Sequence, residues 1–130
     1  MTTDPVAPAV GAACLKTRIR LFLGEEIALG PGKAELLAAI AATGSISAAG
    51  RQLGMSYRRA WLLVVETMNH CFREPLVISA KGGKHGGGAH LSALGQEVLT
   101  LYQHLQAEID RRVADYAPTL YGWLDRKSTR

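Results

Sequence analysis

The fold of this 130-residue chain is decided by residues 45–59, SISAAGRQLGMSYRR. Ser45 or Ser47 can cap a short helix, because a serine hydroxyl accepts a hydrogen bond from an unpaired amide of the first turn. Gly54 ends this helix, and we expect Ser56 to cap the next one at once. Two helices separated by Gly-Met-Ser predict a helix-turn-helix, in which the second helix projects at a steep angle.

A longer helix is expected before this segment. Residues 33–43 carry Leu36, Leu37 and Ile40 within an alanine-rich background, which favours about three helical turns. Gly44 is the residue at which we expect this helix to end.

The helix after Ser56 is expected to run from Tyr57 to about Phe72. Its apolar residues recur at helical spacing, at Ala60, Trp61, Val64, Met68 and Cys71. Because tryptophan is highly buried on average, we expect Trp61 to lie in the core.

Two short hairpins complete the predicted domain. Residues 15–23 alternate between apolar and basic side chains, which predicts a half-buried strand with Leu15, Thr17, Ile19, Leu21 and Leu23 on its inner face. A turn over residues 24–26 leads to a short return strand over residues 27–29. The second hairpin, with strands over residues 76–78 and 89–91 and a glycine-rich loop between them, is interpreted as a wing.

A long helix is expected at the end of the chain. It begins after Ser92, extends for about 22 residues and stops near Pro118. A narrow apolar stripe of this kind commonly pairs with another helix. The stripe, interpreted as a dimerisation surface, consists of Leu94, Val98, Leu101, Leu105, Ile109 and Val113.

These elements predict a mainly α fold with small β-hairpins. We expect a flexible leader over residues 1–14, a winged helix-turn-helix DNA-binding domain over residues 15–92, and a dimerisation helix with a C-terminal tail over residues 93–130. Apolar runs such as residues 60–65 are far shorter than the roughly 18 residues of a membrane-spanning helix. Two widely spaced cysteines, Cys14 and Cys71, are interpreted as reduced thiols in a cytoplasmic protein.

Charge points to a polyanionic partner for the first part of the chain. Ten of the fifteen Lys and Arg residues lie in residues 1–92, against six of the eleven Asp and Glu residues. Arg58 and Arg59 open the second helix of the helix-turn-helix, where arginine can donate two hydrogen bonds to guanine in the major groove of double-stranded DNA. Tyr57 can bind a phosphate or stack. The alternative for this arginine pair is a solvated surface without a ligand.

The glycine-rich loop is open to three interpretations. Lys81, Lys84 and His85 can attract phosphates or enter a minor groove. Successive glycine amides can instead hold an oxyanion. A loop tip without any ligand is the third possibility.

No enzyme or metal site is evident. The four histidines are scattered, with no pair at the four-residue spacing of a helical metal site, and no nucleophile has an orienting partner. We therefore expect neither catalysis nor a cofactor.

The motifs resemble the ModE group of bacterial molybdate-responsive transcription factors, in their N-terminal winged-helix domain. The resemblance spans roughly residues 15–116 and is carried by Gly44-Ser45-Ile46-Ser47, Ser56-Tyr57-Arg58 with Ala60-Trp61, Met68-Asn69, Gly82-Gly83-Lys84 with Gly86-Gly87-Gly88-Ala89 and Leu91, and Gly95-Gln96 leading to Leu101-Tyr102. The pairing of the wing motif with the recognition-helix motif is specific.

The resemblance implies a homodimer that binds operator DNA and uses the long helix from Ala93 in the dimer. The expected DNA contacts are Ser45, Ser47, Arg51, Ser56, Tyr57, Arg58, Arg59, Lys81, Lys84 and His85. Two departures from the family pattern stand out. Residues 62–67 are one residue longer, which a helix bulge can absorb, and we expect no C-terminal molybdate-binding domain.

We therefore interpret the chain as a dimeric, sequence-specific transcriptional regulator. One alternative hypothesis is an oxyanion sensor that uses the glycine-rich loop for molybdate. Another is a partner-capturing protein that forms a heterodimer with a full-length regulator.

Overall fold

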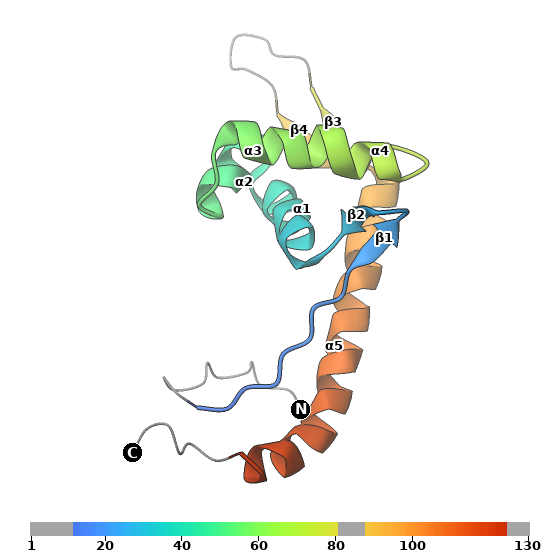
Figure 1. The fold of residues 1–130 in the computed structure, drawn as a ribbon. Helices are drawn as coiled ribbons and strands as arrows, with labels where there is room; N and C mark the ends of the chain where they lie inside the picture. The colour runs from blue at the N-terminus through green and yellow to red at the C-terminus, as the bar shows by residue number, and fades with distance from the viewer. Residues whose placement is uncertain (1–11, 81–87, 125–130) are drawn as a thin grey trace. The chain divides into compact units, whose positions relative to one another are not determined.

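The computed structural model of this chain describes residues 12–80 and 88–124. In chain order its elements are β1 (Leu21–Leu23), β2 (Glu26–Leu29), α1 (Pro31–Thr43), α2 (Ile46–Gln52), α3 (Tyr57–Leu62), the π-helix η1 (Leu63–Met68), α4 (Asn69–Cys71), β3 (Val77–Ser79), β4 (Ala89–Leu91) and α5 (Ala93–Gly122) (Figure 1). The predicted fold class is confirmed: the chain is mainly helical, with two small antiparallel hairpins and a long C-terminal helix.

The chain divides into two compact units. The larger is Arg18–Leu105, and the smaller combines the residues up to Thr17 with those from Gln106 onward. In the smaller unit, Gln106 donates hydrogen bonds to Thr17 and Asp110 at 2.9 Å each. None of the described helices is long and apolar enough to cross a membrane.

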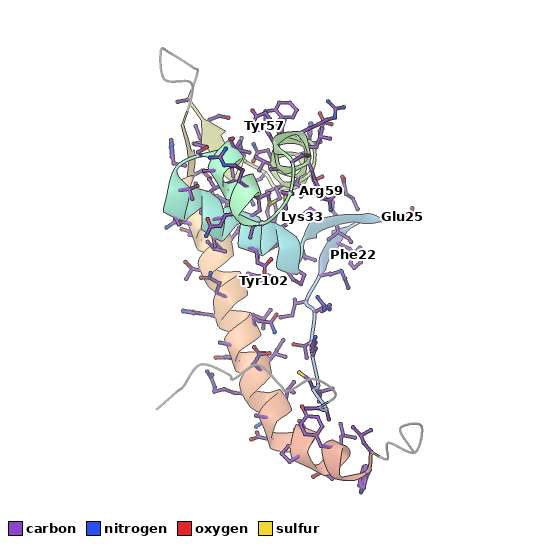
Figure 2. All side chains as sticks on the ribbon, turned by 90° about the vertical axis from the view of Figure 1, so that its left-hand side faces the viewer. Phe22, Glu25, Lys33, Tyr57, Arg59 and Tyr102 are labelled. Atoms are coloured by element: carbon purple, nitrogen blue, oxygen red, sulfur yellow. The ribbon has the colours of Figure 1, made fainter. Side chains whose placement is uncertain are left out.

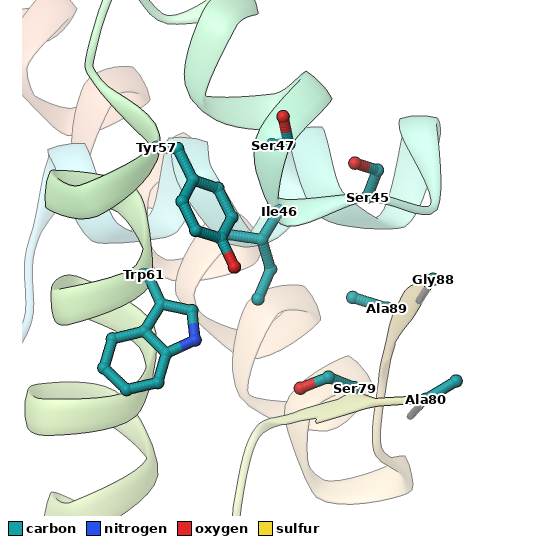
Figure 3. A pocket seen from close by; sticks show the side chains of 9 residues that line it. All are labelled: Ser45, Ile46, Ser47, Tyr57, Trp61, Ser79, Ala80, Gly88 and Ala89. Atoms are coloured by element: carbon teal, nitrogen blue, oxygen red, sulfur yellow. The ribbon is translucent and has the colours of Figure 1, made fainter. Parts of the chain in front are cut away.

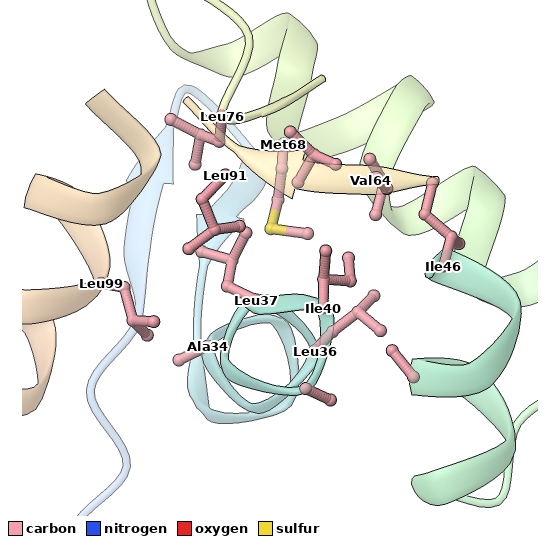
Figure 4. Close-up of a cluster of buried hydrophobic side chains, with 14 of the residues drawn as sticks. Ala34, Leu36, Leu37, Ile40, Ile46, Val64, Met68, Leu76, Leu91 and Leu99 are labelled. Atoms are coloured by element: carbon pink, nitrogen blue, oxygen red, sulfur yellow. The ribbon is translucent and has the colours of Figure 1, made fainter. Parts of the chain in front are cut away.

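The hydrophobic core of the larger unit is built around α1. Leu36, Leu37 and Ile40 are fully buried and meet Val64 and Met68 from the helical run that starts at α3 (Figure 4). Burying each such side chain stabilises the fold by about 1.5–3 kcal/mol. The core therefore fixes which side of α3 faces inward.

Serine caps and glycine turns set the helix boundaries as predicted. The Ser45 hydroxyl accepts from the Ala48 amide at 3.0 Å, so Ser45 rather than Ser47 caps α2. The Ser56 hydroxyl accepts from the Arg59 amide at 3.1 Å and caps α3. Gly44 ends α1 with a left-handed φ of 75°, a conformation that costs glycine little.

The helix predicted from Tyr57 to about Phe72 is confirmed, with a change of hydrogen-bond pattern in its middle. Leu63–Met68 form a π-helix between α3 and α4. A π-helical turn holds one residue more than the α-helical turn it replaces. The register change overlaps residues 62–67, where we expected a helix bulge, and it leaves both Val64 and Met68 in the core.

The first predicted strand is wrong over most of its length. Only Leu21–Leu23 form β1, and these residues are exposed, whereas residues 12–20 form no strand. A half-buried strand needs a surface that covers its apolar face. Among residues 12–80 and 88–124, only the short β2 pairs with β1, and the register shifts between Leu21 and Phe22.

The predicted end of the last helix is also wrong, because α5 continues through Pro118 to Gly122. Proline inside a helix removes one backbone hydrogen bond and normally bends or ends the helix. Contacts on both sides compensate here: Ala117 is buried, and the Tyr121 hydroxyl accepts a 2.7 Å hydrogen bond from the Leu15 amide. Ser92 begins the helix as expected, accepting from the Gly95 amide at 3.0 Å.

Candidate nucleic-acid interface

Small residues bring α2 and α3 close together at the turn. A Cβ atom on the buried Gly50 would lie 3.1 Å from the Ala60 Cβ and 3.4 Å from the Met55 carbonyl oxygen. The Gly54 residue in the turn has a φ of 74°, in the left-handed region that favours glycine. The close approach fixes α3 with Ala60 inward, so the neighbouring Arg58 and Arg59 lie on its exposed side.

Three of the predicted contact residues open α3 and are exposed. They are Tyr57, Arg58 and Arg59, and Figure 2 shows two of them, Tyr57 and Arg59, projecting from the helix. In the described part of the chain, ion pairs form only on α5, between Arg111 and Glu108 and between Arg112 and Asp115. The guanidinium groups of α3 thus carry charge that no described carboxylate neutralises.

The other predicted residues divide into caps and a surface pair. The hydroxyls of Ser45 and Ser56 accept from backbone amides, so these side chains hold helix ends. On α2, Arg51 donates a 3.1 Å hydrogen bond to the Ser47 hydroxyl, which brings these two residues together. Lys81, Lys84 and His85 lie outside the described residues.

The second hairpin is attached to the turn between α1 and α2. The Ala89 amide donates to the Gly44 carbonyl at 2.8 Å, and the Ala80 amide donates to the Gly88 carbonyl at 2.8 Å. The strands pair in register, with Ser79 opposite Ala89. These bonds place the strand ends next to the hairpin loop, at Ala80 and Ala89, beside the start of α2.

Trp61, expected in the core, is 37% exposed. The core face of its helix is taken by Ala60 and Val64, and one position along a helix turns the side chain by about 100°. Trp61 therefore points to the side, beside Tyr57 (Figure 3). The helical spacing of Ala60, Val64 and Met68 is the feature of the sequence from which the exposed position of Trp61 could have been predicted.

Tyr57 and Trp61 form one wall of a pocket of about 260 Å³. Ser45, Ile46 and Ser47 at the start of α2 form a second wall, and Ser79, Ala80, Gly88 and Ala89 of the hairpin form the third (Figure 3). None of the nine lining residues is charged. The pocket therefore joins the three elements that the sequence predicts to bind DNA.

The predicted dimerisation stripe is uncovered in its middle. Leu101 is 70% exposed and Leu105 is exposed, whereas Leu94, Val98, Ile109 and Val113 are half-buried. A neighbouring face of α5, which the sequence reasoning missed, packs Leu99 and Tyr102 into the core. Within Arg18–Leu105, α5 thus has one apolar face that is packed and one that is open.

The Cys71 thiol lies beside an acidic side chain. The Cys71 sulfur lies 3.6 Å from a Glu26 carboxylate oxygen. Burial, together with the negative charge of Glu26, raises the pKa of Cys71 and keeps the thiol protonated. Among the described residues, no group of three or more His, Cys, Asp or Glu side chains is arranged to hold a metal ion.

No protein-family model matches this chain. It is 41% identical over 101 residues to the "Transcriptional regulator ModE" of Yersinia pestis, and 39% identical over 97 residues to the "DNA-binding transcriptional dual regulator ModE" of Escherichia coli K12. It is also 40% identical over 92 residues to the "Molybdenum-pterin-binding protein MopB" of Rhodobacter capsulatus. These matches cover 71–78% of this chain and 34–36% of the relatives.

The chain spans about a third of the length of the curated relatives it matches. Over about three quarters of its own length it is similar to ModE and Mop proteins, which supports the family resemblance that its motifs indicate.

Proposed function

We propose that this chain is a sequence-specific, DNA-binding transcriptional regulator that acts as a homodimer and has no catalytic activity. The observation that carries the proposal is the exposed first turn of α3, where Arg58 and Arg59 have no ion-pair partner among the described residues. Relatives named as transcriptional regulators support it.

In this proposal α3 enters the major groove. Arg58 and Arg59 read base edges, because an arginine at the start of a recognition helix can form two parallel hydrogen bonds with guanine, and Tyr57 binds a phosphate. Arg51, Lys81 and Lys84 bind phosphates and position the protein without reading sequence. The caps at Ser45 and Ser56 hold the N-terminal ends of α2 and α3 at the major groove. Ser47 and His85 contact the sugar-phosphate backbone of the DNA in this proposal.

The open face of α5 is the proposed dimer surface. Leu101 and Leu105 are exposed leucines one helical turn apart, and a second copy of the same helix can bury both. A two-fold dimer reads two half-sites about 34–36 Å apart on one side of the duplex. We therefore expect a palindromic operator.

DNA binding is tested by selecting duplexes from a random pool and then measuring fluorescence anisotropy. The selected duplex and a scrambled duplex of the same length are titrated at several salt concentrations. We expect at least about 1,000-fold tighter binding to the selected duplex and a steep loss of affinity with salt. Equal and weak binding to both duplexes would contradict the proposal.

The dimer is tested with the double variant Leu101→Asp, Leu105→Asp. Because both leucines are exposed in a single chain, we expect the variant to fold and to sediment as a monomer, whereas the unchanged chain sediments as a dimer. Gln103→Asp, an exposed residue on another side of α5, is the matched control and should stay dimeric. A monomeric wild-type chain that associates only with a full-length regulator would favour the partner-capturing hypothesis instead.

A further inference from the structure

The pocket between α2, α3 and the β3–β4 hairpin has the chemistry of a binding site. Trp61 contributes an indole N–H, and Tyr57 and Ser79 contribute hydroxyls. Among the described residues, these three donors take part in no hydrogen bond, whereas Ser45 caps α2 and Ser47 accepts from Arg51. Tyr57, Trp61 and Ser79 are all exposed, so their donors are accessible to a ligand from outside the chain.

The lining combines these donors with apolar walls. The indole ring, Ile46 and Ala80 present carbon surfaces, and none of the described lining residues is charged. In Figure 3 the indole nitrogen of Trp61 is on the side that faces the hairpin. The volume of about 260 Å³ holds far more than one water molecule, whose share of the liquid is about 30 Å³. A ligand with both an apolar ring and acceptor oxygens fits this lining.

We propose that the pocket seats one deoxyribose-phosphate of the bound DNA strand. This inference rests on the proposed function, which puts α3 in the major groove and lets Lys81 and Lys84 bind phosphates of the DNA. The indole of Trp61 packs on the sugar ring, and its N–H, together with the hydroxyls of Tyr57 and Ser79, donates to the phosphate oxygens. Trp61 is thus a DNA-contacting residue and not part of the core.

Loss of the pocket contact should change DNA affinity in a different way from loss of an arginine contact. A phosphate contact carries no sequence information, so its loss weakens binding to the selected and scrambled duplexes by the same factor. Neutral donors do not replace counterions, so the dependence of affinity on salt keeps its slope. Loss of an arginine contact changes either the sequence preference or that slope.

The test compares Trp61→Phe with the matched control Trp123→Phe, in anisotropy titrations of the selected and scrambled duplexes. Phenylalanine keeps a ring but lacks the N–H donor. We expect Trp61→Phe to weaken binding to both duplexes by about tenfold or more, with an unchanged salt slope, because the lost hydrogen bond goes to a charged group. Trp123→Phe should bind like the wild type. Ser79→Ala, at an exposed strand end, should show a smaller loss with the same signature.

A methylphosphonate scan of the selected duplex locates the contact. Each phosphate is replaced in turn by its neutral analogue. One replacement should weaken the wild type by a larger factor than it weakens Trp61→Phe, because the variant has already lost one of the three donors to that phosphate. If every replacement weakens both proteins equally, the pocket holds no phosphate and the inference is overturned.

Fluorescence distinguishes failure of this inference from failure of the proposed function. In Trp123→Phe, Trp61 is the only tryptophan of the chain. Its emission should change as the selected duplex binds. Rising anisotropy with constant Trp61 emission would overturn the pocket assignment alone, and no anisotropy change with any duplex would overturn both. An emission change with inorganic phosphate or molybdate at sub-millimolar concentration, without DNA, would show a small-oxyanion site and overturn the assignment to the DNA strand.

Discussion

The proposed contact of Arg58 with a DNA base can be tested directly by substitution. Arg58 is exposed in the first turn of α3 and has no ion-pair partner in the described part of the chain. We expect Arg58→Ala to cost about 1–3 kcal/mol of binding free energy on the selected duplex and less on a scrambled one, because a bidentate contact with a base is lost. Anisotropy titrations measure both values.

Arg58→Lys is the matched control, since lysine keeps the charge but cannot form the planar pair of hydrogen bonds. It should retain the affinity for scrambled DNA and lose the preference for the selected duplex. Equal losses on both duplexes in Arg58→Ala would instead make Arg58 a phosphate contact.

Asn69 joins the end of the long helical run to β3. Its side-chain oxygen accepts from the amides of Leu76 and Val77 at 2.9 and 3.1 Å, and its nitrogen donates to the Val77 carbonyl at 3.0 Å. Asn69→Ala leaves these backbone groups without partners, each at a cost of about 1–3 kcal/mol.

We therefore expect Asn69→Ala to lower the free energy of unfolding by about 3 kcal/mol in urea titrations. The exposed Gln103→Ala on α5 should change it by less than about 0.5 kcal/mol. An Asn69 variant as stable as the wild type would mean that water replaces these bonds.

At the scale of elements, the start of α5 depends on the absence of a side chain at Gly95. A Cβ atom there would collide with the Leu76 carbonyl oxygen and lie 3.0 Å from its carbonyl carbon. Ser92 strengthens the same contact, because its hydroxyl donates to the Pro75 carbonyl at 2.7 Å. The helix can approach the loop before β3 only through glycine.

Gly95→Ala should therefore destabilise the protein by about 2 kcal/mol or more, although alanine is the better helix former. Gly32→Ala in α1 is the control, since a Cβ atom there meets nothing within 4 Å. It should leave stability unchanged or raise it by up to about 1 kcal/mol. Thermal unfolding followed by circular dichroism measures both, and shifts of the same sign would contradict the packing argument.

At the scale of the whole molecule, Tyr102 connects parts of the chain that are 83 positions apart. Its hydroxyl donates a 2.8 Å hydrogen bond to the Ile19 carbonyl, and its ring lies in the core (Figure 2). Burial raises the pKa of Tyr102 above its usual value near 10, despite the opposing charge of Arg20. The folded state thus favours the neutral phenol.

Tyr102→Phe should lower the free energy of unfolding at pH 7 by about 1 kcal/mol, because one hydrogen bond is lost. The contribution of the phenol is complete below its unfolded pKa, and it is lost as the pH rises through the raised folded pKa. The difference in free energy of unfolding between the wild type and Tyr102→Phe should therefore shrink above about pH 10. Urea unfolding at neutral and alkaline pH tests this, and an unchanged gap would mean that the phenol contributes through packing alone.

The helix-turn-helix, its serine caps, its glycine turns and the second hairpin could all be predicted from the sequence. These features depend on neighbouring residues, because a cap or a left-handed turn is satisfied within a few positions. The exposed Arg58 and Arg59 belong with them, since a cap at Ser56 fixes the first turn of α3. The open stripe around Leu101 also follows from helical spacing in the sequence.

Packing between distant segments sets how far β1 and α5 extend, which way Trp61 points and which second face of α5 is buried, so these features could not be predicted from the sequence. Each of these features depends on whether residues far away in the sequence cover an apolar side chain in the folded chain. No element in the described part of the chain buries Leu21–Leu23, whereas Ala117 and Tyr121 make contacts that carry α5 past Pro118. The helix or strand propensity of a segment does not reveal its tertiary contacts, because burial depends on how the whole chain packs.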